Sequence, residues 1–474
     1  MEHYDFDFVV IGGGSAGYAG ARTAHAEGLK VAVIDGAGEL GGLCILRGCM
    51  PSKTLIETAN RQLVVRHAAE FGLKADSHGV DFHRLRERKR ALIADFAGYR
   101  QGQLEDGRFI LHRGTASFVN PHTVEVRLRD GSADFRLTSR SFLIATGSEV
   151  FVPPVNGLSE TGFWTSDEVL DAAELPETLA VLGGGAIALE MAHYLEAVGC
   201  NVILIQRSAQ LLTGVDPECG AVVREAYERR GIRVYCGTQL TSVQRVEAGK
   251  RVEFTQDGQT HAVCVDEVLL AMGRHPATGG LGLEQVGVAT HRQKITVNDR
   301  MQTSQHHIFA AGDVCSPLDV VHVAIQQGEI AARNAARLLR REVVEEAIDY
   351  RLLLFGVFSK PQVALVGETP EALQKRGVPI IEASYPFNDH GKSMVMGETD
   401  GFVKMIGHAK TGEILGAYAV GPEATEIIHE VVVAMNFRAT AKQFLSIPHY
   451  HPTLSEIWTY PAEEIADQMD KCNV

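Results

Sequence analysis

The chain has 474 residues, 45% hydrophobic and 22% charged, which is the balance of an ordinary globular protein long enough for about three domains. Its formal net charge of −14 and the lack of any long lysine and arginine run argue against a nucleic-acid-binding surface. Eight cysteines in so long a chain, no signal peptide before the first predicted strand and no apolar run of membrane-spanning length favour a cytoplasmic protein.

The first predicted elements form a βαβ unit. An apolar run over residues 6–11 predicts a buried strand that leads directly into the glycine-rich segment GGGSAG at residues 12–17. An alanine-rich stretch up to Gly28 predicts a helix, and a second strand follows over residues 31–35. This order of strand, glycine loop, helix and strand is typical of a dinucleotide-binding fold.

Four residues of this unit suit nucleotide binding. Gly12, Gly14 and Gly17 permit a tight turn, the close approach of a pyrophosphate and close packing of helix on strand, and the helix N-terminus favours negative charge. Asp35 ends the second strand, where its carboxylate reaches a ribose 2′-hydroxyl. We therefore expect a dinucleotide at this loop.

Two cysteines follow in the segment GGLCILRGCMPSK at residues 41–53. On an ideal helix the Cα atoms of Cys44 and Cys49 would be about 8.7 Å apart, whereas a disulfide tolerates roughly 6.8 Å. A bridge would therefore have to bend the backbone, and strained, accessible disulfides tend to be labile or catalytic. Close to a dinucleotide loop the pair indicates electron transfer. The alternative is two reduced, inert thiols.

A second glycine loop, GGGAIA at residues 183–188, lies between predicted strands at 178–182 and 201–205. The chain therefore carries two dinucleotide folds. Consecutive prolines at 153–154 and an Asn-Gly pair at 156–157 are typical of a linker, and we place the boundary between the two folds there.

Three further apolar segments, at residues 142–147, 268–273 and 308–313, end in glycine or a small turn and predict buried parallel strands. Beyond about residue 345 the pattern changes to alternating segments and then a helix over residues 423–437. This pattern predicts a third, α+β domain without a glycine-rich phosphate loop.

The cysteine segment and the sequence HPTLSE at residues 451–456 together resemble the flavoprotein disulfide reductases. This family includes dihydrolipoyl dehydrogenase, glutathione reductase and mercuric reductase. The resemblance extends over the whole chain and is strongest to the dihydrolipoyl dehydrogenase branch, with Leu43 where the family usually has threonine.

The resemblance implies an α/β fold with two Rossmann-like domains, for FAD and NAD(P), and a C-terminal α+β dimerisation domain. The expected domains are residues 1–152 and 276–345 for FAD, 153–275 for NAD(P), and 346–474 for dimerisation. It also implies a homodimer, because the C-terminal motif of one subunit acts in the site of the other.

The resemblance assigns catalytic roles to four residues. Cys49 would be the thiolate beside the flavin, and Cys44 the thiol that attacks the disulfide substrate. Independently of the family, thiol chemistry needs a group that takes and returns a proton; histidine suits this role, and His451 is the candidate. Glu456 could accept a hydrogen bond from its other ring nitrogen. The alternative is a capping histidine and a surface carboxylate.

Sixteen residues are expected to bind the cofactors. Asp313 would meet the ribityl chain of FAD, and Lys53 would lie near the flavin N5, paired with Glu190. The alternatives are a turn-capping carboxylate and ordinary surface charges. The full set is Gly12, Gly14, Gly17, Asp35, Gly42, Lys53, Thr146, Gly147, Gly183, Gly185, Glu190, Arg207, Gly273, Arg274, Gly312 and Asp313. We expect no metal.

The two glycine loops also indicate which nicotinamide cofactor binds. Asp35 lies 23 residues after Gly12, but the residue 23 after Gly183 is Gln206, so the second loop lacks its ribose acid. Arg207 follows, and a guanidinium can hold a 2′-phosphate. We therefore favour NADPH over NADH.

The expected reaction is electron transfer between NAD(P)H, FAD and a lipoyl or other small disulfide. A glutathione-type reductase remains an alternative. His451 and the solitary Cys472 argue against a mercuric reductase, in which the resemblance implies another residue for the histidine and paired C-terminal cysteines. A docking subunit of a lipoyl-bearing complex is the non-catalytic alternative.

Overall fold

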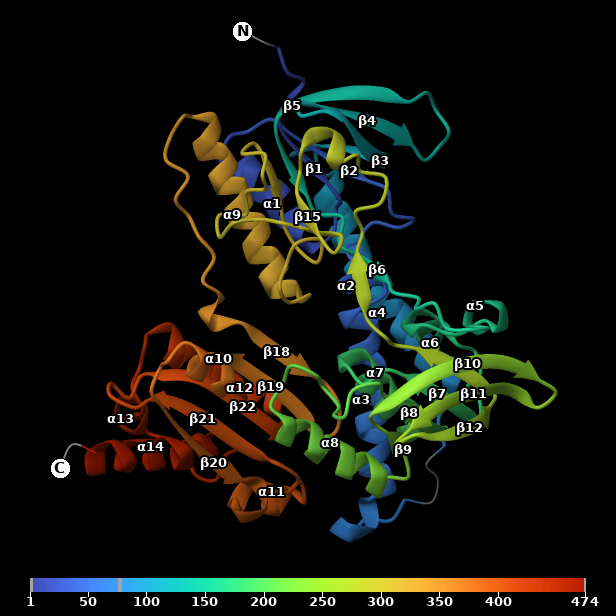
Figure 1. Ribbon diagram of the computed structural model, residues 1–474, viewed down its shortest axis with the longest axis vertical. Coiled ribbons are helices and arrows are strands. Elements are labelled where there is room, and N and C mark those ends of the chain that lie inside the picture. The colour runs from blue at the N-terminus through green and yellow to red at the C-terminus, as the bar shows by residue number, and fades with distance from the viewer. Residues whose placement is uncertain (1–2, 76–78, 473–474) are drawn as a thin grey trace. The chain divides into compact units, whose positions relative to one another are not determined.

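The structure is a computed structural model that describes residues 3–75 and 79–472 (Figure 1). It divides into two compact units, each assembled from three segments of the chain. The first unit takes residues up to 52 together with 86–151 and 273–349, and the second takes 53–85, 152–272 and the residues from 350 on. The predicted domain boundaries at 152, 275 and 345 stay predictions.

The first unit contains a parallel sheet core. Strand β1 (Phe6–Ile11) pairs in parallel with β2 (Val31–Asp35) and with β5 (Phe135–Ile144), and β17 (Ile308–Ala310) pairs in parallel with β5. Nearly all of these residues in β1, β2 and β17 are buried, as expected for parallel strands covered on both faces. The βαβ unit and the strand around residue 310 are confirmed.

Two strands complete the sheet of the first unit. β3 (Ile110–Asn120) pairs in parallel with β2 and antiparallel with β4 (Thr123–Leu128), which pairs antiparallel with β5. Buried and more exposed residues alternate along β3 and β4, so this meander has one covered face. Beside the sheet, helix α1 (Ser15–Ala26) lies against α9 (Val321–Leu339), as Figure 1 shows.

The second unit contains the other parallel sheet. Its strands run in the order β13 (Glu267–Leu270), β7 (Thr178–Leu182), β8 (Asn201–Ile205) and β9 (Arg233–Tyr235), all parallel. Helix α7 (Ala186–Ala197) follows β7 and is buried from Ala188 to its end. Two further elements are α8 (Pro217–Arg229) and an antiparallel sheet of β10 (Thr238–Val246), β11 (Gly249–Gln256) and β12 (Gln259–Val265).

The C-terminal part of the second unit is an antiparallel five-stranded sheet with helices. Its strand order is β18 (Leu354–Val357), β19 (Gln362–Gly367), β22 (Ile414–Gly421), β21 (Phe402–His408) and β20 (Ile380–Pro386). Helix α12 (Ala424–Asn436) packs on β19 and β22, and α14 (Thr459–Cys472) packs on β20. The predicted α+β character of the C-terminal part is confirmed.

Two of the remaining helices are long, α3 (Cys49–Arg66) and α4 (Phe82–Glu105). The other helices and strands are short: α2 (Gly42–Leu46), β6 (Ser148–Val150), α5 (Leu158–Thr161), α6 (Ser166–Asp171), β14 (Arg274–Pro276), β15 (Thr290–His291), β16 (Lys294–Ile295), α10 (Pro370–Lys375), α11 (Gly391–Met396) and α13 (Ala441–Leu445). Among the described residues, every helix is too short or too polar to span a bilayer.

Candidate active site and cofactor sites

The two cysteines lie on successive helices, Cys44 within α2 and Cys49 at the start of α3. Arg47 ends α2 with a φ of −138°, outside the helical range. A Cβ atom on Gly48 would lie 3.0 Å from the Leu43 carbonyl oxygen and 3.1 Å from the Cα of Cys44, so any side chain there would push against this close return of the chain. Both cysteines are half-buried and form a close pair. The expected bend of the backbone is confirmed.

The first glycine loop is tightly packed. Gly12 has a φ of +106°, and a Cβ there would lie 2.3 Å from the Ala145 carbonyl oxygen. A Cβ on Gly17 would collide with the Gly12 carbonyl oxygen, and one on Gly42 would lie 2.7 Å from the Cα of Gly14. Gly42 therefore permits the segment before the cysteines to rest on the nucleotide loop.

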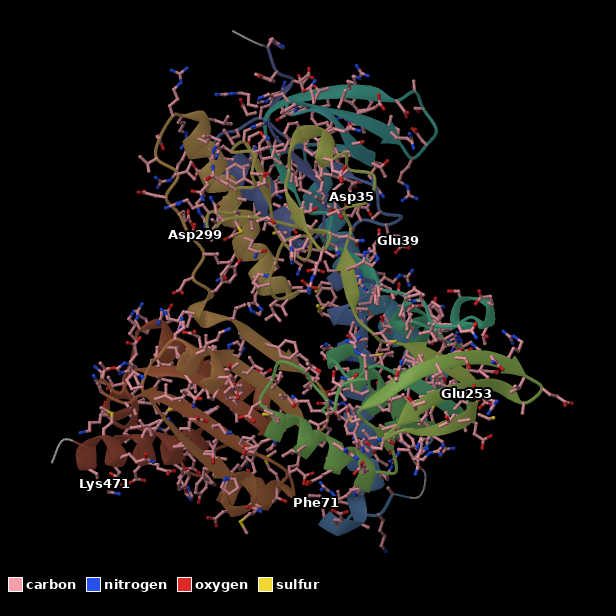
Figure 2. The ribbon with its side chains drawn as sticks, in the orientation of Figure 1. Asp35, Glu39, Phe71, Glu253, Asp299 and Lys471 are labelled. Carbon is pink, nitrogen blue, oxygen red and sulfur yellow. The ribbon has the colours of Figure 1, made fainter. Side chains whose placement is uncertain are left out.

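Asp35 is buried at the end of β2, inside the first unit (Figure 2). Its Oδ2 accepts a hydrogen bond from the Gly13 N–H at 2.8 Å, and its Oδ1 accepts one from the Ala37 N–H at 2.8 Å. A carboxylate has about four acceptor positions, so Asp35 retains capacity for a ribose hydroxyl while it holds the loop.

Asp313 belongs to a polar chain within the first unit. Its Oδ2 accepts from the Ser148 hydroxyl at 2.7 Å, and the Ser148 Oγ in turn accepts from Arg274 Nε at 2.8 Å. Gly312, at a φ of +80°, donates its N–H to the Gln327 side-chain oxygen at 2.8 Å. Ser148 is a member of this chain that the sequence did not indicate.

The other small residues expected at the cofactor form turns. Thr146 Oγ1 donates to the Ala277 carbonyl at 2.7 Å, and Gly147, at a φ of +75°, accepts from the Ala277 N–H at 2.9 Å. Gly273, at +110°, accepts from the Phe151 N–H at 3.1 Å. A Cβ on Gly147 or Gly273 would meet no described atom within 4 Å, so these two positions need glycine for backbone conformation.

Two ion pairs join α3 to α7 in the second unit. Lys53 Nζ donates to both carboxylate oxygens of Glu190, at 2.9 and 2.7 Å, and Arg66 donates to Glu196 at 2.5 Å. The Glu190 carboxylate also accepts from the Phe358 N–H at 3.0 Å and is only 7% exposed. A buried carboxylate needs such partners. The expected Lys53–Glu190 pair is present.

The second glycine loop repeats the geometry of the first. Gly183 has a φ of +125°, and a Cβ there would lie 2.2 Å from the Ala271 carbonyl oxygen. A Cβ on Gly184 would lie 3.1 Å from the Cβ of Gln206, just as one on Gly13 would lie 3.4 Å from that of Asp35. Gln206 therefore occupies the position of the ribose acid. No side chain of the described residues caps α7 at Gly185.

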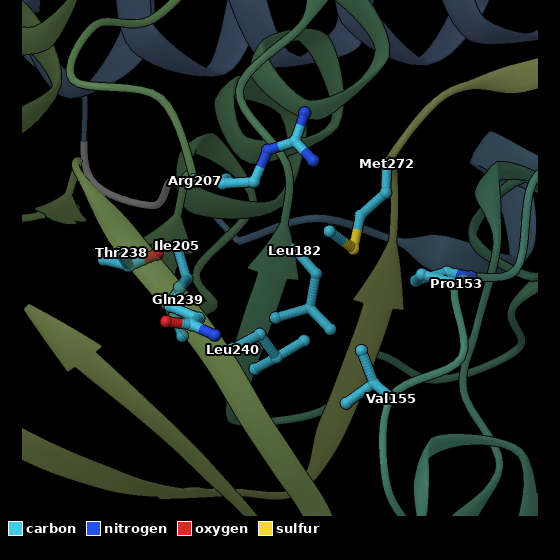
Figure 3. Close-up of a pocket in the computed structure, with 9 residues that line it drawn as sticks. All are labelled: Pro153, Val155, Leu182, Ile205, Arg207, Thr238, Gln239, Leu240 and Met272. Carbon is cyan, nitrogen blue, oxygen red and sulfur yellow. The ribbon is translucent and has the colours of Figure 1, made fainter.

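A cavity of about 170 Å³ opens beside this loop (Figure 3). Arg207, exposed at the end of β8, has its side chain beyond the tip of the strand that carries Leu182. The apolar residues can receive an aromatic base, and the guanidinium lies at the rim. The lining residues are Pro153, Val155, Leu182, Ile205, Arg207, Thr238, Gln239, Leu240 and Met272.

The C-terminal motif forms a histidine–carboxylate pair. His451 Nδ1 lies 3.1 and 3.0 Å from the two carboxylate oxygens of Glu456. The His451 side chain is 78% exposed, whereas that of Glu456 is only 13% exposed. Thr453 donates its N–H to Glu456 and accepts from the Glu456 N–H with its hydroxyl, both at 3.4 Å. An anchored carboxylate thus presents an accessible imidazole.

A second histidine, which the sequence did not indicate, lies behind this pair. His390 is fully buried, and its Nε2 is 3.6 Å from Glu456 Oε1. Burial lowers the pKa of His390. No motif spacing connects residues 390 and 456, so no feature of the sequence marked this contact.

The predicted residues fall into groups within the two units. The first unit brings together Cys44 with Cys49, the first glycine loop with Asp35, and Asp313 with Arg274 through a serine. The second brings together the Lys53 pair, the second glycine loop with its cavity, and the C-terminal pair.

The family follows from sequence comparison. The profile described as pyridine nucleotide-disulphide oxidoreductase matches residues 6–328, and that of the dimerisation domain of the same family matches residues 355–462. The chain belongs to the pyridine nucleotide-disulphide oxidoreductases, enzymes that act on sulfur groups with FAD and NAD(P). The predicted enzyme class and fold class are confirmed.

Particular relatives are similar over nearly the whole chain. The chain is 35% identical over 468 residues to the dihydrolipoyl dehydrogenase of Thermus scotoductus, covering 98% of each. It is 33% identical over 460 residues to that of Chlamydia muridarum, covering 96% of each. Among solved structures, LpdA from Mycobacterium tuberculosis superposes with a TM-score of 0.85 at 28% identity, covering 97% of this chain and 99% of LpdA.

Proposed function

We propose that this chain is a homodimeric, NADPH-preferring disulfide oxidoreductase of the dihydrolipoyl dehydrogenase type, with Cys44 and Cys49 as its redox pair. The observation that carries the proposal is the return of the chain at Gly48, which brings the two thiols together just after Gly42, the residue that rests on the nucleotide loop. A cytoplasmic location stays a prediction from cysteine content.

The residues of the first unit fit FAD. Gly12 and Gly17 are crowded, and Gly14 at the N-cap leaves the N-terminus of α1 without a side-chain cap; such an N-terminus suits a pyrophosphate. In this proposal Asp35 would hold the adenosine ribose and Asp313 would hold the ribityl chain. When bound, FAD supplies reversible two-electron transfer between nicotinamide and the cysteine pair.

The chain's own residues perform the thiol chemistry. In the reduced enzyme Cys44, as a thiolate, attacks one sulfur of the substrate disulfide, forming a mixed disulfide and releasing a substrate thiolate. His451 of the other subunit gives that leaving sulfur its proton, and Glu456 stabilises the imidazolium through Nδ1. Cys49 then attacks Cys44, re-forming the Cys44–Cys49 disulfide and releasing the second substrate thiolate.

Replacement of the attacking thiol tests this order of events. We expect Cys44→Ser to retain FAD and to oxidise the nicotinamide, while turnover of a disulfide falls to background, because serine cannot form the mixed disulfide. The measurement is steady-state turnover beside the absorbance of bound FAD. Disulfide reduction at the wild-type rate in this variant would contradict the proposal.

The substrate is proposed as a lipoyl or other small disulfide because of the similarity to dihydrolipoyl dehydrogenases. A matrix of NADH and NADPH against lipoamide, glutathione disulfide and Hg²⁺ measures the choice directly. Highest kcat/KM with lipoamide supports the proposal. Preference for glutathione disulfide or Hg²⁺ would place the enzyme elsewhere in the family, and no disulfide turnover would favour a docking role.

The preference for NADPH rests on two neighbouring residues. Gln206 stands where the first loop has an acid, so no carboxylate there repels a 2′-phosphate, and Arg207 lies at the rim of the cavity.

Lipoyl dehydrogenases use NADH, so the direct test of the NADPH preference is substitution of Arg207. We expect Arg207→Glu to lower kcat/KM for NADPH by about tenfold or more and to spare NADH. Arg233→Glu, on the neighbouring strand, serves as a charge control. An unchanged preference in Arg207→Glu would remove this residue from the site.

A further inference from the structure

His390 is a buried histidine for which the reaction described above has no role. It lies between a short 3₁₀ turn, Phe387–Asp389, and helix α11. Its Nδ1 is 2.9 Å from the hydroxyl oxygen of Ser393. Its Nε2 has no hydrogen-bond partner among the described residues and is 3.6 Å from Glu456 Oε1. A buried ring nitrogen directed at a carboxylate needs an explanation.

The Glu456 carboxylate lies between two imidazoles. On one side His451 Nδ1 approaches its oxygens to 3.0 and 3.1 Å, and on the other His390 Nε2 approaches Oε1. The backbone N–H of Thr453 donates to the same Oε1 at 3.4 Å. The exposed histidine can exchange protons with solvent or substrate, whereas the buried one cannot.

The other neighbours of His390 are mainly aromatic. The rings of Phe387 and Tyr460 stand nearly perpendicular to its imidazole at 6.4 and 6.5 Å. Tyr460 stacks on Tyr385 at 3.8 Å, and the Tyr385 hydroxyl donates to Asp389 Oδ2 at 2.9 Å. The Asp389 carboxylate thus has a partner of its own, and the charged groups that act on the pKa of His390 are Glu456 and His451.

The surroundings define one tautomer of His390. Burial lowers its pKa, which favours the neutral imidazole with a single N–H. If the Ser393 hydroxyl donates to Nδ1, the proton is on Nε2 and faces Glu456. The other tautomer would direct a lone pair at a carboxylate, which is unfavourable. The 3.6 Å separation is longer than a hydrogen bond, and such bonds often tighten only when substrate is bound.

We propose that His390 is a positioning residue for proton transfer: its Nε2–H faces the Glu456 carboxylate and keeps it oriented toward His451. The proposal rests on the proposed function, in which His451 moves the proton. The geometry assigns a group of three, with His390 fixing Glu456, Glu456 fixing His451, and His451 alone meeting the substrate.

Three variants of the holoenzyme test this assignment. His390→Phe keeps an aromatic ring but removes the N–H, His390→Gln supplies another neutral donor, and His451→Gln removes the proton carrier. The readouts are the pKa of His451 by NMR of ¹⁵N-histidine-labelled protein and the pH profile of kcat/KM for disulfide reduction. Reduction of bound FAD by NADPH, measured separately, reports whether the fold and the nicotinamide site are intact.

The Glu456 carboxylate depends on the Nε2–H of His390 more when His451 is neutral than when His451 is protonated. Loss of that N–H therefore destabilises the state with neutral His451 more than the state with protonated His451. We therefore expect His390→Phe to raise the measured pKa of His451 and to move the matching limb of the pH profile to higher pH. His390→Gln should restore most of the wild-type value, and flavin reduction should be unchanged in both variants.

Two results would overturn the inference. The first is a wild-type pKa and pH profile in His390→Phe. The second is an equal shift in His390→Phe and His390→Gln, because a donor would then make no difference and the role would be packing alone. His451→Gln separates the proposed function from the role of His390. If it retains full disulfide turnover, the proposed function fails as well. If it abolishes turnover while His390→Phe keeps the wild-type profile, only this inference fails.

Discussion

Gly48 shows how one residue without a side chain sets the geometry of the redox pair. A Cβ there would press on two backbone atoms, the Leu43 carbonyl oxygen at 3.0 Å and the Cys44 Cα at 3.1 Å. Backbone atoms cannot rotate away as the end of a flexible side chain can. The separation of the two sulfur atoms therefore depends on a position that carries no reactive group.

We expect Gly48→Ala to lower kcat for disulfide reduction by about tenfold, because displacing Cys44 by a few tenths of an ångström misplaces a reacting atom. Gly48→Val should lower it further. Transfer of electrons from NAD(P)H to FAD should be unaffected. Gly98→Ala in α4, where a Cβ meets no described atom within 4 Å, is the matched control. Equal turnover in wild type and Gly48→Ala would show that the close return is not required.

At the scale of elements, the crossing of α1 and α9 holds the nucleotide loop in place. A Cβ on Gly328 of α9 would lie 2.2 Å from the Ala16 carbonyl oxygen and 3.2 Å from the Gly20 nitrogen, both in α1. Gly20 in turn faces Leu143 of β5. Small residues on both helices thus allow a close backbone approach, which fixes the N-terminus of α1 over the sheet.

We expect Gly328→Ala to destabilise the protein by about 1–3 kcal/mol, because the added methyl group must push two backbones apart. The same substitution at Gly98 or Gly102 in α4 should be neutral or stabilising by up to about 1 kcal/mol, because alanine is the better helix former and the space is open. Calorimetric unfolding of the three variants measures the difference. Equal transition temperatures for Gly328→Ala and Gly98→Ala would contradict the crossing as described.

At the scale of the whole molecule, the proposed catalytic residues come from both compact units. Cys44 and Cys49 belong to the first, and His451 and Glu456 to the second. A dimerisation-domain profile covers residues 355–462, which includes the C-terminal pair. In the proposed homodimer each active site combines the cysteines of one subunit with the histidine of the other.

Mixing two inactive variants tests this arrangement. Cys44→Ser and His451→Gln chains, denatured and refolded together in equal amounts, should recover about one quarter of wild-type activity, because half of the dimers would be mixed and each would contain one intact site. Each variant refolded alone should stay inactive, and wild type refolded alone gives the reference. No recovery in the mixture, with mixed dimers demonstrated by mass, would indicate that both residues act within one chain.

The sequence by itself determined the two glycine loops, their strands, the α+β character of the C-terminal part and the family. These features are local, because hydrophobic periodicity and glycine spacing follow from the geometry of a single strand or helix. The bend between the two cysteines could also be predicted, because residues five apart on an unbroken helix are too distant for a disulfide bridge.

Only the tertiary structure decided which distant residues meet. Ser148 joins Asp313 to Arg274, Gln206 lies beneath Gly184, and His390 reaches Glu456 across more than sixty positions. No periodicity records such contacts, because they depend on how separate elements pack. The meander of β3 and β4 was not predicted either, because the alternation of buried and more exposed residues along a strand does not tell which strands pair.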